Sequence, residues 1–231
     1  MQPTPILTPD SSSQSIALAP NRVLRNTYAL LALSLVPTVL GAWIGMQLNF
    51  SFFQGSPVIG FIAFLAIAFG FMFAIEKTKN SAIGVAVLLG FTFFMGLMLS
   101  RLVGSVLGMS NGASLIALAG GGTAAIFFGM SSLAATIKRD LSGMSKWLFV
   151  GAIGLMIGGI VNVFVGSPVG MMVLSTLAIV IFSAYMLFDL KQIVDGGETN
   201  YISATLALYL DIFNVFQSLL ALLGIMGGER E

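Results

Sequence analysis

The chain has 231 residues, of which 57% are hydrophobic and only 8% are charged, and its formal net charge is +1. Soluble domains carry about 25% charged residues, so this composition excludes an ordinary soluble fold of this size. With a mean hydropathy of +1.00, the chain is predicted to be an all-α polytopic membrane protein. The small net charge gives no overall field that would attract nucleic acid.

The N-terminal segment over residues 1–25 does not resemble a signal peptide, because it lacks an early basic region and a continuous apolar core. Three prolines and a run of three serines fall within its first half: Pro3, Pro5, Pro9 and Ser11 to Ser13. This composition predicts a disordered tail.

Seven apolar segments follow, each close to the ~20 residues that a helix needs to cross a bilayer. They cover residues 27–48, 57–75, 81–103, 113–137, 147–165, 168–190 and 202–226. The tetrapeptide GSPV precedes or opens both the second and the sixth segment, and Ser followed by Pro is a favoured helix start. We therefore predict a seven-helix transmembrane domain over residues 26–227, followed by a short tail over residues 228–231.

The distribution of lysine and arginine predicts a cytoplasmic N-terminus. Two basic residues lie toward the opposite side, Arg101 and Arg230, and eight lie on the side of the N-terminus: Arg22, Arg25, Lys77, Lys79, Lys138, Arg139, Lys146 and Lys191. Seven spans then put the C-terminus outside the cell, whereas a re-entrant last segment would keep it inside.

Asp211 lies in the middle of the last apolar segment, where a carboxylate costs roughly 2.5–3.5 kcal/mol on insertion scales. At 100° per residue, small and polar side chains share its face of the helix. They are Ser203, Ala204, Ala207, Asn214 and Ser218. This stripe predicts that Asp211 points toward other helices, either as part of a functional site or as a protonated acid that bridges two helices.

A second carboxylate, Asp189, ends the sixth segment, and Tyr185 lies one turn before it on the same face. Asp189 could be a solvated residue at a helix end or a partner of Asp211. If the two acids meet on inward faces, their titrations are coupled, which makes a proton-sensitive lock in a chain without histidine. Their oxygens would also suit weak binding of a hard cation such as Ca²⁺. Arg101 and Lys191 are the candidate counter-charges.

No enzyme is predicted. The chain contains no cysteine and no histidine. It also lacks a nucleophile elbow and a phosphate-binding loop with lysine. Two aspartates could in principle form an intramembrane aspartyl protease, but Asp189 lies near a helix end and Asp211 near a helix centre. No cofactor is expected, apart from Ca²⁺ as a transported or weakly bound ion.

Three stretches carry a resemblance to a known family. They are RVLRNTYALLALSL in the first segment, LAGGGTAAIFF in the fourth, and KQIVDGGETNYISATLALYLDIFNVFQSLLALLG at the end. Over Arg22 to Gly224 the chain resembles the Bax-inhibitor/YccA family, and GGETNYI with VLRNTY is most similar to its bacterial YccA branch. The resemblance implies a multi-pass protein of the bacterial inner membrane, with six helices around a central amphiphilic seventh.

The resemblance also implies two functions. YccA-like members bind FtsH, a membrane-anchored ATP-dependent protease, and modulate its proteolysis of membrane proteins. Other bacterial members are pH-sensitive calcium leaks with a di-aspartyl pair, which matches Asp189 in FDLKQI and Asp211 in LYLDIFN. In that family an arginine of the second helix latches to one of the aspartates. The second segment of this chain contains no arginine.

Overall fold

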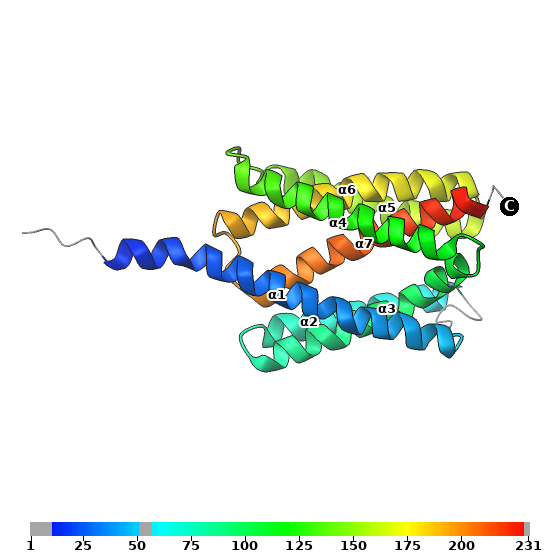
Figure 1. The fold of residues 1–231 in the computed structure, drawn as a ribbon, viewed down its shortest axis with the longest axis horizontal. Helices are drawn as coiled ribbons and strands as arrows, with labels where there is room; N and C mark the ends of the chain where they lie inside the picture. Colours follow the sequence, from blue (N-terminus) through cyan, green and yellow to red (C-terminus); the bar gives the residue numbers. More distant parts are fainter. Residues whose placement is uncertain (1–10, 51–56, 229–231) are drawn as a thin grey trace, which may run out of the picture.

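The computed structural model describes residues 11–50 and 57–228, and side chains over 22–50 and 58–227. Across these residues the secondary structure consists of seven α-helices without a strand (Figure 1). Their bounds are α1 Ser11–Gln47, α2 Pro57–Thr78, α3 Ala82–Leu107, α4 Gly112–Thr136, α5 Met144–Val165, α6 Pro168–Val194 and α7 Tyr201–Gly228. All seven are long and apolar enough to cross a membrane, which confirms the predicted fold class.

The helix ends lie within a few residues of the predicted segments, except at the N-terminus. The apolar span of α1 begins at Arg22, but the helix itself begins at Ser11. Residues 11–25 of the predicted tail are therefore helical backbone in this structure, and residues 1–10 lie outside the described residues. At the other end, Gly228 closes α7, and the rest of the predicted C-terminal tail is also outside the described part.

The seventh helix lies at the centre of the bundle. It contacts α1, α2, α3, α4 and α6, whereas α5 packs against α6. Figure 1 shows α7 running between one group made of α1, α2 and α3 and another made of α4, α5 and α6. The central seventh helix is as expected, but α5 departs from the expected ring because it forms an outer layer on α6.

α7 is continuous over 28 residues, so the re-entrant alternative does not describe this structure. The first residues of α1 and the last residues of α7 lie at opposite ends of the bundle (Figure 1). The structure does not place the membrane sides, so the cytoplasmic N-terminus stays a prediction.

Glycines allow α1 and α3 to pack backbone to backbone. A Cβ atom on Gly96 of α3 would lie 2.1 Å from the Thr38 carbonyl oxygen, and one on Gly41 of α1 would lie 2.2 Å from the Phe93 carbonyl oxygen. Real side chains do not approach this closely, so only glycine fits at these two positions. Small residues at such contacts are a common device of membrane helices, where close packing replaces the hydrophobic driving force.

We predict that Gly96→Ala destabilises the protein by about 1–3 kcal/mol, the usual cost of overpacking a tight contact. Gly129→Ala is the matched control, because a Cβ on Gly129 of α4 would meet no atom within 4 Å. Thermal unfolding of both purified variants in the same detergent measures the difference. Equal melting temperatures would contradict the close α1–α3 contact.

Candidate functional site

α7 carries polar residues on two opposite faces, and each face meets a different group of helices. Asp211 lies on one face, and Thr205 and Tyr209 lie on the other, about 120–160° away at 100° per residue. The first face meets α6, and the second meets α1 and α3, with the Thr205 hydroxyl 3.4 Å from the Thr27 carbonyl oxygen of α1. The candidate site is built on the first face.

Asp211 is buried in the interior, with only 4% of its surface exposed. Asp211 itself therefore points toward other helices, as predicted, whereas Ser203, Asn214 and Ser218 of the stripe are half-buried. One carboxyl oxygen, Oδ2, has no hydrogen-bond partner among the described residues. An unsatisfied oxygen on a buried carboxyl group is costly, so a proton, a cation or a movement of the helices can change the energy of this position substantially.

Asp189 lies on α6 near Asp211, close enough for the two carboxyl groups to interact. Asp189 is half-buried. The short connection over residues 195–200 makes α6 and α7 an antiparallel hairpin, which brings the end of α6 beside the first half of α7. Asp189 near the end of α6 and Asp211 near the middle of α7 can therefore lie close to each other.

Among the other predicted site residues, Tyr185 lies near the pair, and its ring stacks on Phe182 with centroids 6.0 Å apart. It lies close enough to both carboxyl groups to interact with their charge. Asn214 uses its side-chain amide within α7, where Nδ2 donates to the Leu210 carbonyl at 2.8 Å. Ser218 is half-buried and makes no hydrogen bond within the described chain. The structure thus gathers Asp189, Asp211 and Tyr185, and does not join Asn214 or Ser218 to them.

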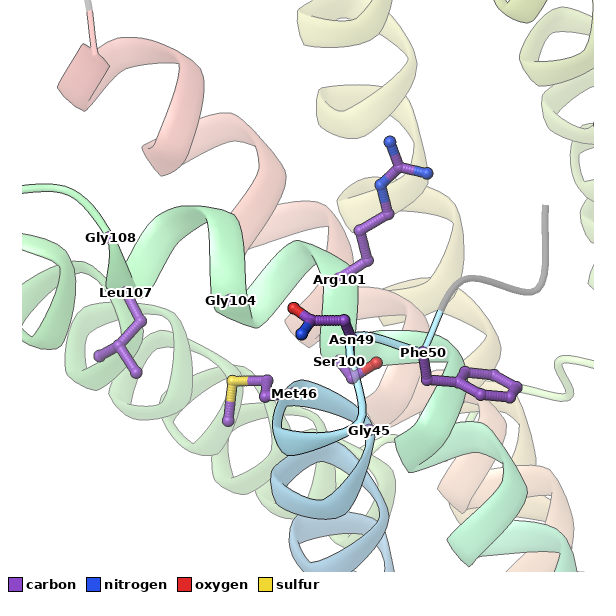
Figure 2. A pocket seen from close by; sticks show the side chains of 9 residues that line it. All are labelled: Gly45, Met46, Asn49, Phe50, Ser100, Arg101, Gly104, Leu107 and Gly108. Atoms are coloured by element: carbon purple, nitrogen blue, oxygen red, sulfur yellow. The ribbon is translucent and has the colours of Figure 1, made fainter. Parts of the chain in front are cut away.

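Neither candidate counter-charge faces the acid pair. Lys191 forms an ion pair with Asp195, with Nζ and Oδ1 2.7 Å apart. Arg101 lies 19 residues into α3, roughly 28 Å along the helix from the end where Asp189 lies. It lines a cavity of about 680 Å³ between the ends of α1 and α3, and Figure 2 shows its side chain extending away from Met46 and Leu107. α2 offers no arginine for the latch of the family, and its Lys77 lies over the ring of Phe73.

The second polar face of α7 was missed by the sequence analysis. Tyr209 is fully buried, and its hydroxyl hydrogen-bonds the Thr38 hydroxyl of α1 at 2.9 Å. The same hydroxyl also lies 3.4 Å from the carbonyl oxygen of Thr92 on α3. The sequence feature that could have indicated this face is a tyrosine within an apolar segment, two residues before Asp211. A tyrosine inside a membrane bundle needs a hydrogen-bond partner for its hydroxyl.

The start of α7 is held by Asn200, which was also missed. Its Oδ1 accepts hydrogen bonds from the backbone N–H groups of Ile202 and Ser203 at 2.9 and 3.2 Å, so the side chain caps the helix. Its Nδ2 donates to the Lys79 carbonyl and to the Asn80 Oδ1 at 3.1 and 2.9 Å. One side chain therefore joins the beginning of α7 to the α2–α3 loop.

The chemistry open to this arrangement is the exchange of a proton or a cation rather than bond cleavage. Two carboxyl groups offer at most four oxygens, whereas Ca²⁺ takes six to eight. The described residues contain no group of three or more acidic, histidine or cysteine side chains that would complete a metal shell. Ca²⁺ at this pair would need water or backbone oxygens as further ligands, which fits a passing ion better than a resident one.

Comparison with known proteins identifies relatives along nearly the whole chain. The family described as "Inhibitor of apoptosis-promoting Bax1" matches residues 20–228. An uncharacterized membrane protein of Vibrio cholerae is 39% identical over 226 residues, which cover 98% of this chain and 99% of the relative.

Two relatives from Escherichia coli carry more informative names. The "Modulator of FtsH protease YccA" of strain K12 is 36% identical over 214 residues, covering 93% of this chain and 94% of the relative. The "Inner membrane protein YccA" of an O6:H1 strain matches with the same identity and coverage. These names describe a membrane protein that modulates a protease, and none of them describes an enzyme.

We predict that Asn200→Ala lowers the free energy of unfolding by about 1–2 kcal/mol, since loss of a helix cap costs up to this much. Asn200→Asp should cost less, because its carboxylate still accepts the two N–H bonds of α7 but cannot donate to the α2–α3 loop. Chemical unfolding in mixed micelles measures both. Asn111→Ala serves as the control, because Asn111 stands at the same place before α4 without a side-chain cap. A loss equal to that of the control would contradict the role of Asn200.

Proposed function

The chain belongs to the Bax-inhibitor family of multi-pass membrane proteins, and on this basis we propose that it associates with the FtsH protease and modulates its activity in the bacterial inner membrane. The relative named as a modulator of FtsH is 36% identical over 93% of this chain, and this is the observation that carries the proposal.

The N-terminal part of α1 is the element that we assign to contact with the protease. Residues 11–21 precede the apolar span, and at 1.5 Å per residue they extend about 16 Å beyond it. Figure 1 shows this part of α1 projecting past the other helices at the end of the bundle. With the predicted cytoplasmic N-terminus, the projection is available to a protease that works on the cytoplasmic side of the membrane.

A second candidate function is a pH-sensitive calcium leak, and the meeting of Asp189 and Asp211 is the observation that favours it. Fully buried apolar side chains lie one turn before each acid, Met186 on α6 and Leu208 on α7. Conduction would therefore require α6 and α7 to separate, and a change in the protonation of the pair is a physical cause for that separation. The two functions are compatible in one molecule.

Deletion of residues 2–20 is expected to abolish co-purification of FtsH with the tagged protein from Escherichia coli membranes. The control replaces the same residues with an unrelated polar segment of equal length. It shows whether FtsH association requires this particular sequence or only a segment of this length. The half-life of a membrane substrate of FtsH is measured in parallel, in cells lacking their own YccA. Unchanged association and unchanged half-life after the deletion would contradict the proposed contact.

For the calcium leak, we expect Ca²⁺ influx into proteoliposomes to differ between two pH values for the unaltered protein, and to lose this difference in Asp211→Asn. An amide cannot change its charge, so the variant removes the titration while keeping the size of the side chain. Asp195→Asn is the control, because Asp195 is an exposed acid at the same end of α6. Equal flux in all variants at both pH values would rule out the leak.

A further inference from the structure

A groove of about 680 Å³ runs along the outside of the bundle between α1 and α4, with α7 as its floor. Its walls are stripes of residues at helical spacing. On α1 the stripe includes Tyr28, Leu31, Leu35, Val39 and Met46, and on α4 it includes Ile116, Gly120, Ala124, Phe127 and Phe128. All of these helices are membrane spans, so the groove opens toward the hydrocarbon of the bilayer.

The lining favours an apolar occupant, because its hydroxyl groups already have hydrogen-bond partners within the protein. The Thr38 and Tyr209 hydroxyls bond each other, and the Thr123 hydroxyl donates to the Ala119 carbonyl at 2.7 Å. At one end of the groove the Tyr28 hydroxyl bonds the Ser131 hydroxyl at 2.7 Å and joins α1 to α4. Between these groups the surface is aliphatic or aromatic.

The length and the apolar lining of the groove suit a hydrocarbon chain. Tyr28 and Met46 are 18 residues apart on α1, which corresponds to roughly 27 Å. An alkyl chain makes its contacts at carbon–carbon distances of about 3.5–4.0 Å and can lie against such an apolar surface along its length.

Positive charge lies at the end of the groove that Tyr28 and Ser131 close. On α1, Arg25 lies one turn before Tyr28 and on the same side of the helix. Lys138 and Arg139 follow directly after the end of α4, seven and eight residues beyond Ser131. All three side chains are exposed, and within the described chain none of them forms an ion pair.

None of the described acidic side chains forms an ion pair with these three cations. Asp140 accepts hydrogen bonds from the backbone N–H and the hydroxyl of Ser142, both at 2.8 Å. Asp195 is paired with Lys191, and Glu76 with Lys79. The three cations therefore remain available to an external anion at the level where lipid headgroups lie.

From the apolar groove and the cations at its end, we infer that this protein binds an anionic phospholipid, with one acyl chain between α1 and α4 and the phosphate beside Arg25, Lys138 and Arg139. An acyl chain of one leaflet reaches about half of the ~30 Å hydrocarbon core, so it occupies the half of the groove nearest Tyr28. This inference is independent of the proposed contact with FtsH.

Native mass spectrometry of the delipidated full-length protein with phosphatidylglycerol or phosphatidylcholine tests the headgroup part. We expect the unaltered protein to prefer phosphatidylglycerol, and Arg25→Gln to weaken this binding about fivefold, as one basic residue near an anionic headgroup contributes. The triple change of Arg25, Lys138 and Arg139 to glutamine should remove the preference. Lys146→Gln, which removes an exposed cation of α5 away from the groove, should retain it.

The acyl-chain part is tested with two neighbouring substitutions on α4. Ala124→Phe places a ring in the groove and should weaken the binding of both lipids, whereas Ala125→Phe, exposed but outside the groove lining, should not. Circular dichroism and gel filtration establish that both variants are folded.

Three results would overturn the inference. They are a triple variant that keeps the preference for phosphatidylglycerol, equal lipid binding by the two phenylalanine variants, and a dimer that Ala124→Phe dissociates while lipid binding is unchanged. The last result would assign the groove to a second copy of the chain instead.

Discussion

The burial of a carboxyl group inside a membrane-spanning helix, that of Asp211 in α7, is the main physical constraint on this bundle. A carboxyl group inside a membrane protein is tolerated only where another group takes part of its hydrogen-bonding capacity. Asp211 is 4% exposed, and its Oδ2 has no hydrogen-bond partner among the described residues. The short α6–α7 connection packs α6 along α7, which brings Asp189 and Tyr185 of α6 near the buried carboxyl group.

α7 connects the two halves of the bundle because it is polar on two sides. Its acid face meets α6, and Tyr209 on its other side hydrogen-bonds Thr38 of α1. Asn200 adds a third connection at the start of the helix, to the α2–α3 loop. A movement that parts Asp189 from Asp211 must therefore either carry α7 with α1, α2 and α3 or break hydrogen bonds on its other face.

The sequence was sufficient to predict the seven spans and the inward face of Asp211, because hydropathy and helical periodicity are local properties. It could not decide whether Asp189 meets Asp211, since that depends on how two helices cross and on the length of their connection. The Thr38–Tyr209 bond joins residues 171 positions apart and has no local pattern. The outer position of α5 was also beyond prediction, because an apolar helix that faces lipid has the same composition as one that faces other helices.

A double-mutant cycle on Asp189 and Asp211 tests the central contact most directly. Leucine resembles aspartate in shape and forms no hydrogen bond, so Asp189→Leu, Asp211→Leu and the double variant are unfolded in mixed micelles and their free energies compared. If the two carboxyl groups interact, we expect a coupling energy of about 0.5–3 kcal/mol, the range for residues in contact. Effects that add to within about 0.5 kcal/mol would show that the two acids act independently, and would contradict a shared site.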